Sequence, residues 1–404
     1  MAQPDIATFA LYDADNHYYE PRDCYTRHLD PKHREAAIHV EVDADGHEVV
    51  MVGDKPFTFL RHHSFDRAGK PGGLREMLRN LKSGRVEPAE AREESLRPEY
   101  VDRDARLALM DTQGIETALL FPTLGVCVEH FMMDDVDQMY ANVHSFNLWV
   151  DDDWGFDHRG RIVAPPLLNL LDLDRAVAEL EFVLDRGAKA IALRPGPVAG
   201  RSPADPYFDP FWARVDEARV PVCFHIAESG YNQMMSVHWG EEANPASHFQ
   251  SALQWTCFYG DRPIMDTVAA LIFQNLFGRF PNINVISVEN GSLWVPYLMA
   301  AMDKMKGMGR NGPWIGGYVS GRPSEVFRRH VFVSPYHEED IVALARAIGP
   351  SQVLFGSDYP HPEGLAEPRD FAGAIAELPD DEVRMIMRDN LRGLLGFDRA
   401  GVPA

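Results

Sequence analysis

The stretch from Val353 to Gly364, Val-Leu-Phe-Gly-Ser-Asp-Tyr-Pro-His-Pro-Glu-Gly, constrains the fold of this chain most strongly. Its first three residues form an apolar run that predicts a short strand buried on both faces, and the following Gly-Ser pair allows the backbone to turn. Two prolines flank His361 and exclude a regular helix or a central strand there, so this histidine is expected on a stiff loop. A carboxylate such as Asp358, at the end of a buried strand and before such a loop, is typical of a metal ligand in a barrel enzyme.

Apolar runs alternate with helical patterns along most of the remaining chain. This alternation predicts an α/β fold of the (β/α)8 TIM-barrel type. A doubly wound open sheet is the alternative, but no GxGxxG motif follows any run, and polar residues end runs throughout the chain. The expected strands are Leu11–Asn16, Thr117–Pro122, Ile162–Leu168, Ala190–Pro195, Pro221–Ile226, Asn284–Asn290, Val331–Ser334 and Val353–Phe355.

The pattern predicts one domain over residues 1–404, with one insertion and a helical tail. The insertion, residues 22–100, follows the first strand and contains two alternating runs around Asp45-Gly46, which is a strong hairpin signal. Its remaining part is rich in loops, so we interpret the whole insertion as a lid over the first strand. The tail is expected to pack outside the barrel as helices over residues 380–396.

Composition excludes several classes of function. With 45% hydrophobic and 25% charged residues, the chain has the composition of a globular protein. The net charge of −22 argues against binding to nucleic acids or to anionic membranes. No apolar run is long enough for a membrane span, no signal peptide is evident, and the four cysteines show no CxxC spacing. We therefore expect a cytoplasmic enzyme with free thiols and a small-molecule substrate.

The C-terminal ends of barrel strands form the active-site rim, and several polar residues fall there. Asp15 and His17 are two residues apart, so on a strand they share one face and can bind one metal ion from the same side. Glu20 follows within reach of the same pocket. Two histidines and two or three carboxylates on one rim suit a divalent ion such as zinc, iron or manganese. The residues predicted at the rim are Asp15, His17, Arg194, His225, Glu289, His337 and Asp358.

Five segments resemble the amidohydrolase superfamily, in the branch that contains aminocarboxymuconate-semialdehyde decarboxylase and γ-resorcylate decarboxylase. They are Asp15-Asn-His17, Leu193-Arg-Pro195, Phe280-Pro281, Glu289–Tyr297 and Phe355-Gly-Ser-Asp-Tyr-Pro-His361, and the tail Asn390–Gly396 is also similar. The resemblance implies that Asp15, His17, His225 and Asp358 bind the metal, and that Asp358 also takes a proton from metal-bound water. It further implies a homodimer, which is common in this family.

Glu289 departs from the pattern of the well-known decarboxylases, in which the sixth strand ends in a histidine that acts as the acid/base. A glutamate has a lower intrinsic pKa and is a poorer proton donor unless burial raises that pKa. It is a better ligand for a hard cation and can bridge two ions, so one or two metal ions per chain are possible. Its alternative role is to cap the helix that begins near Leu293.

The remaining candidates keep two interpretations each. His361 is assigned as catalytic, donating a proton or contacting substrate, or else it only holds its loop by a hydrogen bond. Arg194 is expected to clamp a substrate carboxylate, or else to form a buried ion pair. Trp294 is expected in an apolar substrate wall, or else in the core.

Three functions follow from these candidates. The favoured one is a metal-dependent hydrolase in which activated water attacks an ester, thioester, amide or similar acyl bond, with Asp358 as the base. The alternative is a non-oxidative decarboxylase of an aromatic or unsaturated carboxylate. A metal-stabilised binding protein is the third, and the absence of a Cys-rich ligand set argues against it.

Overall fold

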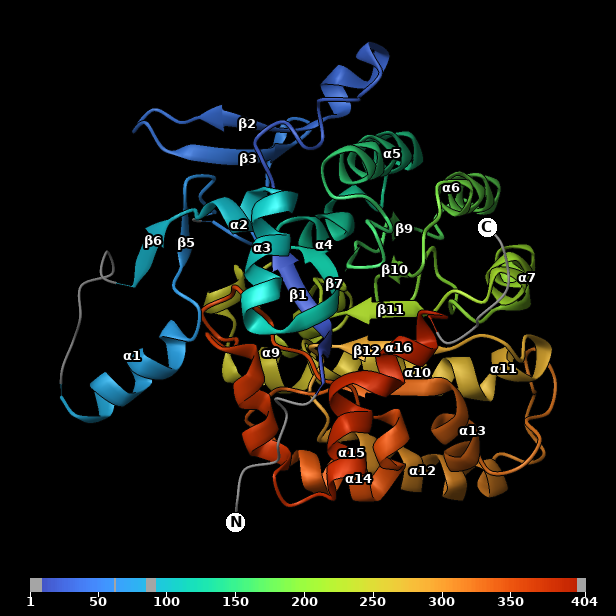
Figure 1. Ribbon diagram of the computed structural model, residues 1–404. Helices are drawn as coiled ribbons and strands as arrows, with labels where there is room; N and C mark the ends of the chain where they lie inside the picture. Colours follow the sequence, from blue (N-terminus) through green and yellow to red (C-terminus); the bar gives the residue numbers. More distant parts are fainter. Residues whose placement is uncertain (1–8, 62, 85–91, 398–404) are drawn as a thin grey trace.

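The computed structural model describes residues 9–61, 63–84 and 92–397, and its centre consists of parallel strands surrounded by helices (Figure 1). One sheet has the order β1-β7-β8 and the other has the order β13-β12-β11-β10-β9. The strands are β1 (Leu11–Tyr18), β7 (Ile115–Pro122), β8 (Ile162–Val163), β9 (Leu167–Leu168), β10 (Ile191–Leu193), β11 (Val222–His225), β12 (Val285–Val288) and β13 (Val331–Ser334).

The predicted third strand, Ile162–Leu168, is divided into β8 and β9. Pro165 and Pro166 lie between the two pieces, and neither proline has an N–H for a ladder hydrogen bond. Strand β8 pairs with β7, and β9 pairs with β10. The interrupted strand therefore connects the two sheets.

The predicted eighth strand, Val353–Phe355, is not a regular strand, but it occupies the expected place between β13 and β1. Val353 forms a parallel bridge with Val333, and the N–H of Leu354 donates to the Val333 carbonyl at 2.9 Å. On the other side the N–H of Ala14 donates to the Phe355 carbonyl at 2.8 Å. The described strands thus form a TIM-barrel-like α/β arrangement from two sheets and a bridging segment, and not one continuous closed sheet.

Strand side chains alternate between two apolar cores because successive residues point to opposite faces. The inner core contains Tyr12, Ala14, Phe121, Cys223 and Ile286 among others. The larger outer core lies between the strands and the surrounding helices. This double burial gives the central strands their near-continuous apolar sequences.

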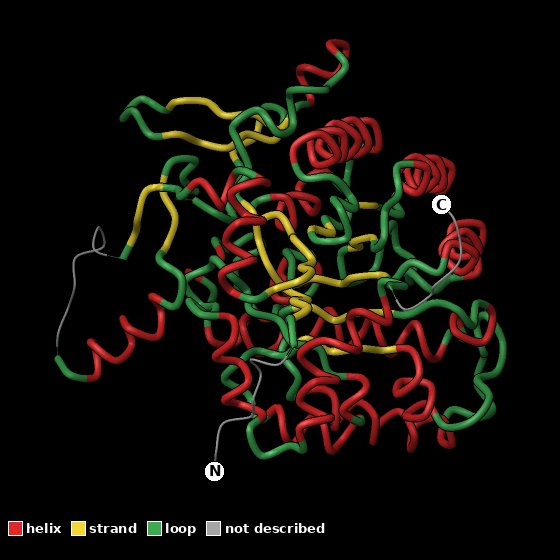
Figure 2. The backbone as a smooth tube through the Cα atoms, in the orientation of Figure 1, coloured by secondary structure: helices red, strands yellow, loops and turns green. Residues whose placement is uncertain are grey.

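Helices cover the outside of the strands, as the red segments around the yellow ones show in Figure 2. Aspartates begin several of these helices, since Asp102, Asp135 and Asp172 each accept a hydrogen bond from the backbone N–H three residues later. The longer helices are α3 (Arg103–Gln113), α5 (Val136–Asp153), α6 (Leu173–Asp185), α7 (Asp209–Ala218), α10 (Asp261–Phe273), α12 (Trp294–Met308), α13 (Pro323–His330) and α14 (Ile341–Ile348). The shorter ones are α2 (Pro98–Val101), α4 (Gly125–Val128), α8 (Tyr231–Met234), α9 (Ala252–Cys257) and α11 (Leu276–Arg279). The predicted helical tail contains α15 (Asp380–Arg384), a π-helical turn (Met385–Asp389) and α16 (Asn390–Leu394).

The segment predicted as an insertion has its own small sheets, and its residues 62 and 85–91 lie outside the described residues. Strands β2 (Ile38–Val42) and β3 (Glu48–Val52) pair as an antiparallel hairpin around the Asp45-Gly46 turn, and the hairpin stands apart from the central strands in Figure 1. The N–H of Leu74 donates to the Pro362 carbonyl at 2.9 Å, so this segment contacts the loop that carries His361. Its other elements are β4 (Lys55–Pro56), β5 (Arg67–Gly69), α1 (Gly73–Lys82) and β6 (Glu93–Ser95).

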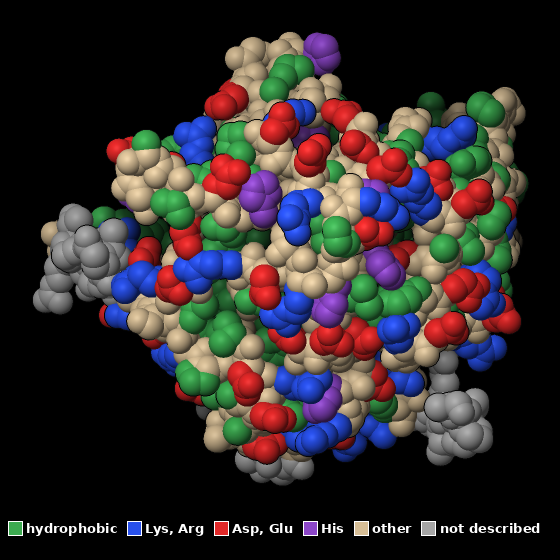
Figure 3. All heavy atoms as spheres, turned by 90° about the horizontal axis from the view of Figure 1, so that it is seen from above, with side chains coloured by type: hydrophobic (Ala, Val, Ile, Leu, Met, Phe, Trp, Pro, Cys, Tyr) green, Lys and Arg blue, Asp and Glu red, His purple; other side chains and the backbone are tan. Residues whose placement is uncertain are grey.

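Charges of both signs are mixed on one face of the molecule (Figure 3). On the face drawn in Figure 3, acidic and basic side chains of the described residues are interspersed, without a broad basic patch. In the part of the chain that the structure describes, no helix combines the length and the apolar character that crossing a membrane requires.

Candidate metal centre and adjoining cavity

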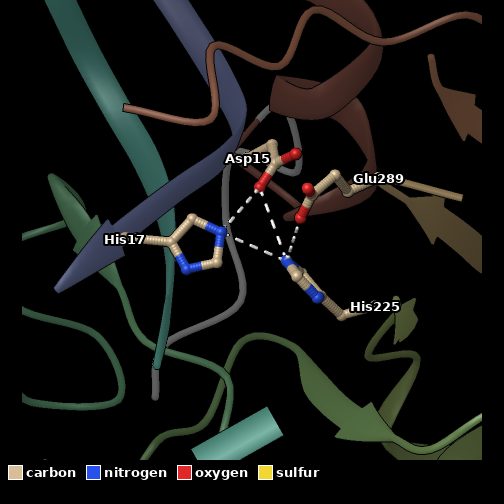
Figure 4. A group of neighbouring side chains, drawn as sticks. All are labelled: Asp15, His17, His225 and Glu289. Carbon is tan, nitrogen blue, oxygen red and sulfur yellow. Dashed lines mark hydrogen bonds and ion pairs between the residues drawn. The ribbon is translucent and has the colours of Figure 1, made fainter. Parts of the chain in front are cut away.

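Four side chains from three strand ends converge at the centre of the molecule (Figure 4). Asp15 and His17 come from β1, His225 is the last residue of β11, and Glu289 directly follows β12. Each of the four offers one ligand atom, and these atoms lie within 4.8 Å of one another. Asp358, after the eighth segment, joins them through its Oδ1 atom, 3.4 Å from His17 Nε2.

The two histidines present unprotonated nitrogens to this centre. His17 Nδ1 lies 3.2 Å from the Pro122 carbonyl, and His225 Nδ1 lies 2.8 Å from the Ile226 carbonyl. A carbonyl only accepts, so Nδ1 of each ring carries a proton, and in this tautomer Nε2 has a lone pair for a metal ion. The two Nε2 atoms are 3.2 Å apart with no proton to share, which is the arrangement of two imidazoles that bind one ion.

Asp15 supplies an oxygen to the same point. Its Oδ1 lies 3.3 Å from His17 Nε2 and 3.7 Å from His225 Nε2, and it is buried without a hydrogen-bond partner. A buried oxygen without a donor is costly unless a cation compensates it. Glu289 Oε2, 3.4 Å from His225 Nε2, adds a further oxygen. Two neutral imidazoles and several carboxylates are a fitting donor set for a divalent metal ion.

The electrostatics of the centre also favour a cation. Burial, together with the charges of Asp15 and Glu363, raises the pKa of Asp358 well above its usual value. Burial, together with the charges of Asp358 and Asp15, raises the pKa of Glu289 well above its usual value. Burial and the nearby His361 lower the pKa of His17 to about 3, so its ring is neutral at pH 7. A bound divalent ion would stabilise both carboxylates in their charged form.

Two of the converging carboxylates have unusual backbone conformations. Glu289 has φ 55° and Asp358 has φ 52°, both in the left-handed region that non-glycine residues seldom adopt. Strained residues of this kind cluster at functional sites. Gly356 is required beside them, because a Cβ at this position would overlap the side chains of Ser334 and Asp15.

Asp358 and His361 share a proton. His361 Nδ1 lies 2.7 Å from Asp358 Oδ1, and His361 Nε2 lies 3.1 Å from Thr123 Oγ1. The Thr123 hydroxyl donates to the Tyr18 carbonyl at 2.9 Å, so it must accept from His361 Nε2–H. The short Nδ1–Oδ1 contact then requires a second proton, on the ring or on the carboxyl group. The pair is therefore a proton reservoir beside the metal centre.

Sequence analysis missed the residues that hold the end of β1 in place. The buried carboxylate of Asp13 accepts from the N–H groups of Asp15 and Ser357 at 3.1 and 3.0 Å and from the Ser357 hydroxyl at 2.5 Å. Buried Arg106 donates to the His17 carbonyl at 2.7 Å and to the Asn16 side chain. The two-residue spacing from Asp15 was no guide to Asp13, because the register of β1 shifts between Asp13 and Asn16 and the regular alternation of faces is lost there. Nothing in the sequence indicated Arg106.

A cavity of about 320 Å³ opens next to the metal centre. It is lined by Asp15, Glu289, Pro335, Tyr336, His337, Glu338, Glu339, Gly356, Ser357, Asp358 and Glu363. Asp358 thus lines the cavity, whereas His361, which contacts Asp358, does not. His337, which the sequence placed at the rim, lines this cavity but does not join the metal-type cluster.

Three predicted site residues lie elsewhere. Glu20 accepts from the N–H groups of Leu124 and Gly125 at 2.9 and 2.8 Å and is outside every described cluster of potential ligands. Arg194 does not line the cavity, because its guanidinium group is bonded to Glu129 at 2.9 Å. Trp294 donates to the carbonyls of Asn290 and Gly291 and is buried in the core. The geometry therefore favours the buried ion pair for Arg194 and the core position for Trp294, the alternatives that the sequence left open, and it does not bring Glu20 to the metal-type cluster.

Comparison with known proteins points to one family. The family profile described as Amidohydrolase matches residues 13–397. γ-Resorcylate decarboxylase from Rhizobium sp. (strain MTP-10005) is 23% identical over 319 residues, which cover 74% of this chain and 88% of that protein.

Solved structures show the same relationship. A crystal structure of an amidohydrolase from Mycobacterium avium subsp. paratuberculosis K-10 has a TM-score of 0.86 and 40% identity, and covers 96% of this chain and 99% of its own. A 5-carboxyvanillate decarboxylase from Novosphingobium aromaticivorans DSM 12444, complexed with manganese and 4-hydroxy-3-methoxy-5-nitrobenzoic acid, has a TM-score of 0.62 and 15% identity. It covers 98% of this chain and 99% of its own, and at this identity the similarity concerns the fold alone.

Proposed function

The chain belongs to the amidohydrolase family, and we propose that it is a metal-dependent, non-oxidative decarboxylase of an aromatic or unsaturated carboxylate. The observation that carries the proposal is the buried, unpartnered Asp15 Oδ1 beside two imidazole lone pairs, at the end of a cavity that fits a small molecule. The γ-resorcylate decarboxylase relative supports this choice over the hydrolase that the sequence favoured. The hydrolase interpretation has support only at the level of the superfamily.

Asp15, His17, His225 and Asp358 would hold the metal ion, and manganese is the first ion to test because the structure of the Novosphingobium decarboxylase contains it. A bound divalent ion supplies positive charge that anchors the substrate carboxylate and stabilises the negative charge developing in the reaction. The neutral histidines are fixed in their tautomers by the carbonyls on Nδ1. They are thus ready to bind the ion without losing a proton.

The reaction needs one proton for the carbon that loses its carboxyl group. When the bond to the carboxyl group breaks, carbon dioxide leaves and the electron pair stays on the substrate carbon, which then takes up the proton. Asp358 lines the cavity, and with its carboxylate held in the charged form the proton that the pair shares lies on His361, so the pair is positioned to pass this proton to the substrate carbon. His361, held by Thr123, orients Asp358 and takes up a proton from solvent before the next turnover.

Glu289 favours a second candidate, a metal-dependent hydrolase, because it stands where the well-known decarboxylases have a histidine. In that reaction Asp358 would accept a proton from the attacking water, and Glu289 would orient the water or bind the metal ion. The two candidates differ in product. Hydrolysis leaves an acid and an alcohol, thiol or amine, whereas decarboxylation releases carbon dioxide.

The segment of residues 22–100 is proposed as a lid. It contacts the His361 loop through the Leu74–Pro362 hydrogen bond, and a Cβ at Gly69 would meet the Pro362 ring. A closed lid would exclude water from the negatively charged carbon until it is protonated.

The proposal is tested by loading the protein with manganese and supplying a panel of hydroxybenzoates and unsaturated carboxylates. Release of carbon dioxide with one equivalent of the protonated product is the expected result. Activity towards esters, thioesters or amides, with no carbon dioxide from any carboxylate, would support the hydrolase. Metal content per chain, measured by elemental analysis, is expected to be one ion.

A further inference from the structure

The cavity beside the metal centre is strongly acidic. Six of its eleven lining residues carry carboxylates, and none of them is a lysine or arginine. Asp15 is buried and its Oδ1 has no hydrogen-bond partner, whereas Glu338 and Glu363 are exposed at the mouth. The cavity therefore runs from a metal-type centre to an acidic entrance.

Protein groups and one divalent ion offset only part of this charge. Glu339 accepts from the N–H and hydroxyl of Ser292 at 3.0 and 2.7 Å, and Glu338 lies 3.4 Å from His337 Nδ1. Glu363 offers an oxygen within 4.8 Å of oxygens of Glu289 and Asp358. A divalent ion compensates two negative charges, so excess negative charge remains towards the mouth. Arg75 of α1 lies near His337 but does not line the cavity.

An aromatic ring stands among these carboxylates. Tyr336 lines the cavity and packs against Gly291, where a Cβ would lie 3.1 Å from the ring. Gly291 has φ +65°, so a side chain would be strained there as well as crowded. A ring beside carboxylates is the composition with which proteins bind organic cations, since both attract positive charge.

We propose that the mouth of the cavity binds a protonated nitrogen of the substrate, an ammonium or guanidinium group. The substrate would then be an amino- or guanidino-substituted carboxylate, with its carboxylate at the metal centre and its cation near Glu338, Glu363 and Tyr336. A second carboxylate at the mouth would be repelled by these glutamates. The position of the substrate carboxylate rests on the proposed function, whereas the preference for a cation rests on the cavity alone.

The test measures binding of matched probes to the manganese-loaded protein by calorimetry. The first set is 3-(aminomethyl)benzoate, 3-(hydroxymethyl)benzoate and benzene-1,3-dicarboxylate, which differ in the charge of one substituent. The second set, benzylamine and benzyl alcohol, lacks the carboxylate. We expect each ammonium probe to bind about tenfold more tightly than its alcohol, and the dicarboxylate to bind most weakly of the first set.

Variants that lack the negative charges at the mouth of the cavity test which residues cause the preference. Glu338→Gln with Glu363→Gln is expected to reduce the ammonium preference to about twofold or less. Glu377→Gln, an exposed glutamate outside the cavity, is the matched control and should leave the preference unchanged. Tyr336→Leu, in a separate variant, should lower the affinity for benzylamine more than that for benzyl alcohol.

Several results would overturn the inference. They are equal or tighter binding of the dicarboxylate, absence of binding by both ammonium probes, or a preference that survives the double variant. Uptake of a second manganese ion that is lost in Glu363→Gln would also overturn it, because the metal would then occupy these carboxylates. Failure of the proposed function would give a different result from failure of this inference. The protein would then release no carbon dioxide from any carboxylate, but it would still bind benzylamine more tightly than benzyl alcohol.

Discussion

Two polar clusters lie at the ends of the central strands, and they differ in whether their members are paired. In the cluster of Asp15, His17, His225, Glu289 and Asp358, acceptor atoms face one another. In the cluster of Arg194, Glu129 and Asn169, each charged group faces a complementary one. Glu129 accepts from Arg194 Nε at 2.9 Å and from Asn169 at 2.6 Å.

The adjoining cavities differ in the same way. The space beside Arg194 is about 10 Å³, close to the size of one water molecule, whereas the metal-type cluster borders about 320 Å³. A satisfied buried network stabilises a fold, and an unsatisfied one beside a cavity is prepared for a ligand. A position at the end of a strand is therefore not enough to identify a site residue. Buried acceptor atoms that lack donors and border a cavity identify the site.

The largest expected effect is that of Asp358→Asn on catalysis. The substitution removes the shared proton, so we expect carbon dioxide release to fall by about 10²–10⁴-fold. Steady-state assays with metal content measured in parallel provide the check. Asp303→Asn, at a carboxylate that accepts from Ser324 on the outside of the barrel, is the control and should retain activity. Full activity of the Asp358→Asn variant would show that Asp358 is not needed for catalysis. The comparison between the cluster with unmatched acceptors and the paired cluster would then fail.

Arg194→Ala is expected to act on stability. It leaves Glu129 buried without its cation, which costs about 3–5 kcal/mol in the free energy of unfolding, while the metal content stays unchanged. Chemical denaturation of the manganese-loaded protein measures the loss, and Glu129→Gln provides a second variant in the same pair. If Arg194→Ala raises KM without lowering stability, the substrate clamp that the sequence predicted is correct and the comparison fails.

Glu289→Gln sharpens the role of the residue that departs from the decarboxylase pattern. We expect one metal ion per chain in both proteins and a loss of activity of about 10²-fold, because the variant keeps the size of the side chain but removes the charge of a carboxylate beside the metal-type cluster. Elemental analysis and kinetics are the measurements. Two ions in the wild type and one in the variant would indicate a two-metal centre with Glu289 as a ligand.

The smallest expected effect concerns Glu228, which lies beside the Arg194 cluster. Burial raises its pKa to about 6, against the hydrogen bond from Gly230 and the charge of Arg194. The folded state therefore binds the proton more tightly than the unfolded state, and stability falls as pH rises from about 4.5 through 6. The loss is about 2 kcal/mol.

Glu228→Gln should remove this pH dependence. The variant is expected to be more stable than the wild type at pH 8, and this advantage should be about 2 kcal/mol smaller at pH 4. Denaturation curves at several pH values between 4 and 8 measure the difference. A constant difference across this range would show that Glu228 does not titrate as the burial implies.

The sequence predicted much of the architecture, because burial on both faces leaves long apolar runs that alternate with helical patterns. Its limits appear at the third strand, where Pro165-Pro166 divides the predicted run, and at Val353–Phe355, which bridges two strands without being a regular strand itself. Strand boundaries depend on hydrogen bonds to neighbours from elsewhere in the chain. The apolar pattern carries no information about those bonds.

For the site, the sequence determined the chemistry of each strand end. The two-residue spacing of Asp15 and His17 sets their common face, and the prolines around His361 fix its loop. These are local properties, decided by backbone geometry over a few residues.

Tertiary structure decided which polar residues meet. Arg194 follows its strand as Glu289 does, yet Glu129 pairs with the arginine and only Glu289, through a left-handed turn, reaches the centre. Glu20 is bonded by the N–H groups that follow β7. A side chain's partner often lies a hundred or more residues away, as Ser357 does from Asp13, and only the folded chain brings such partners together.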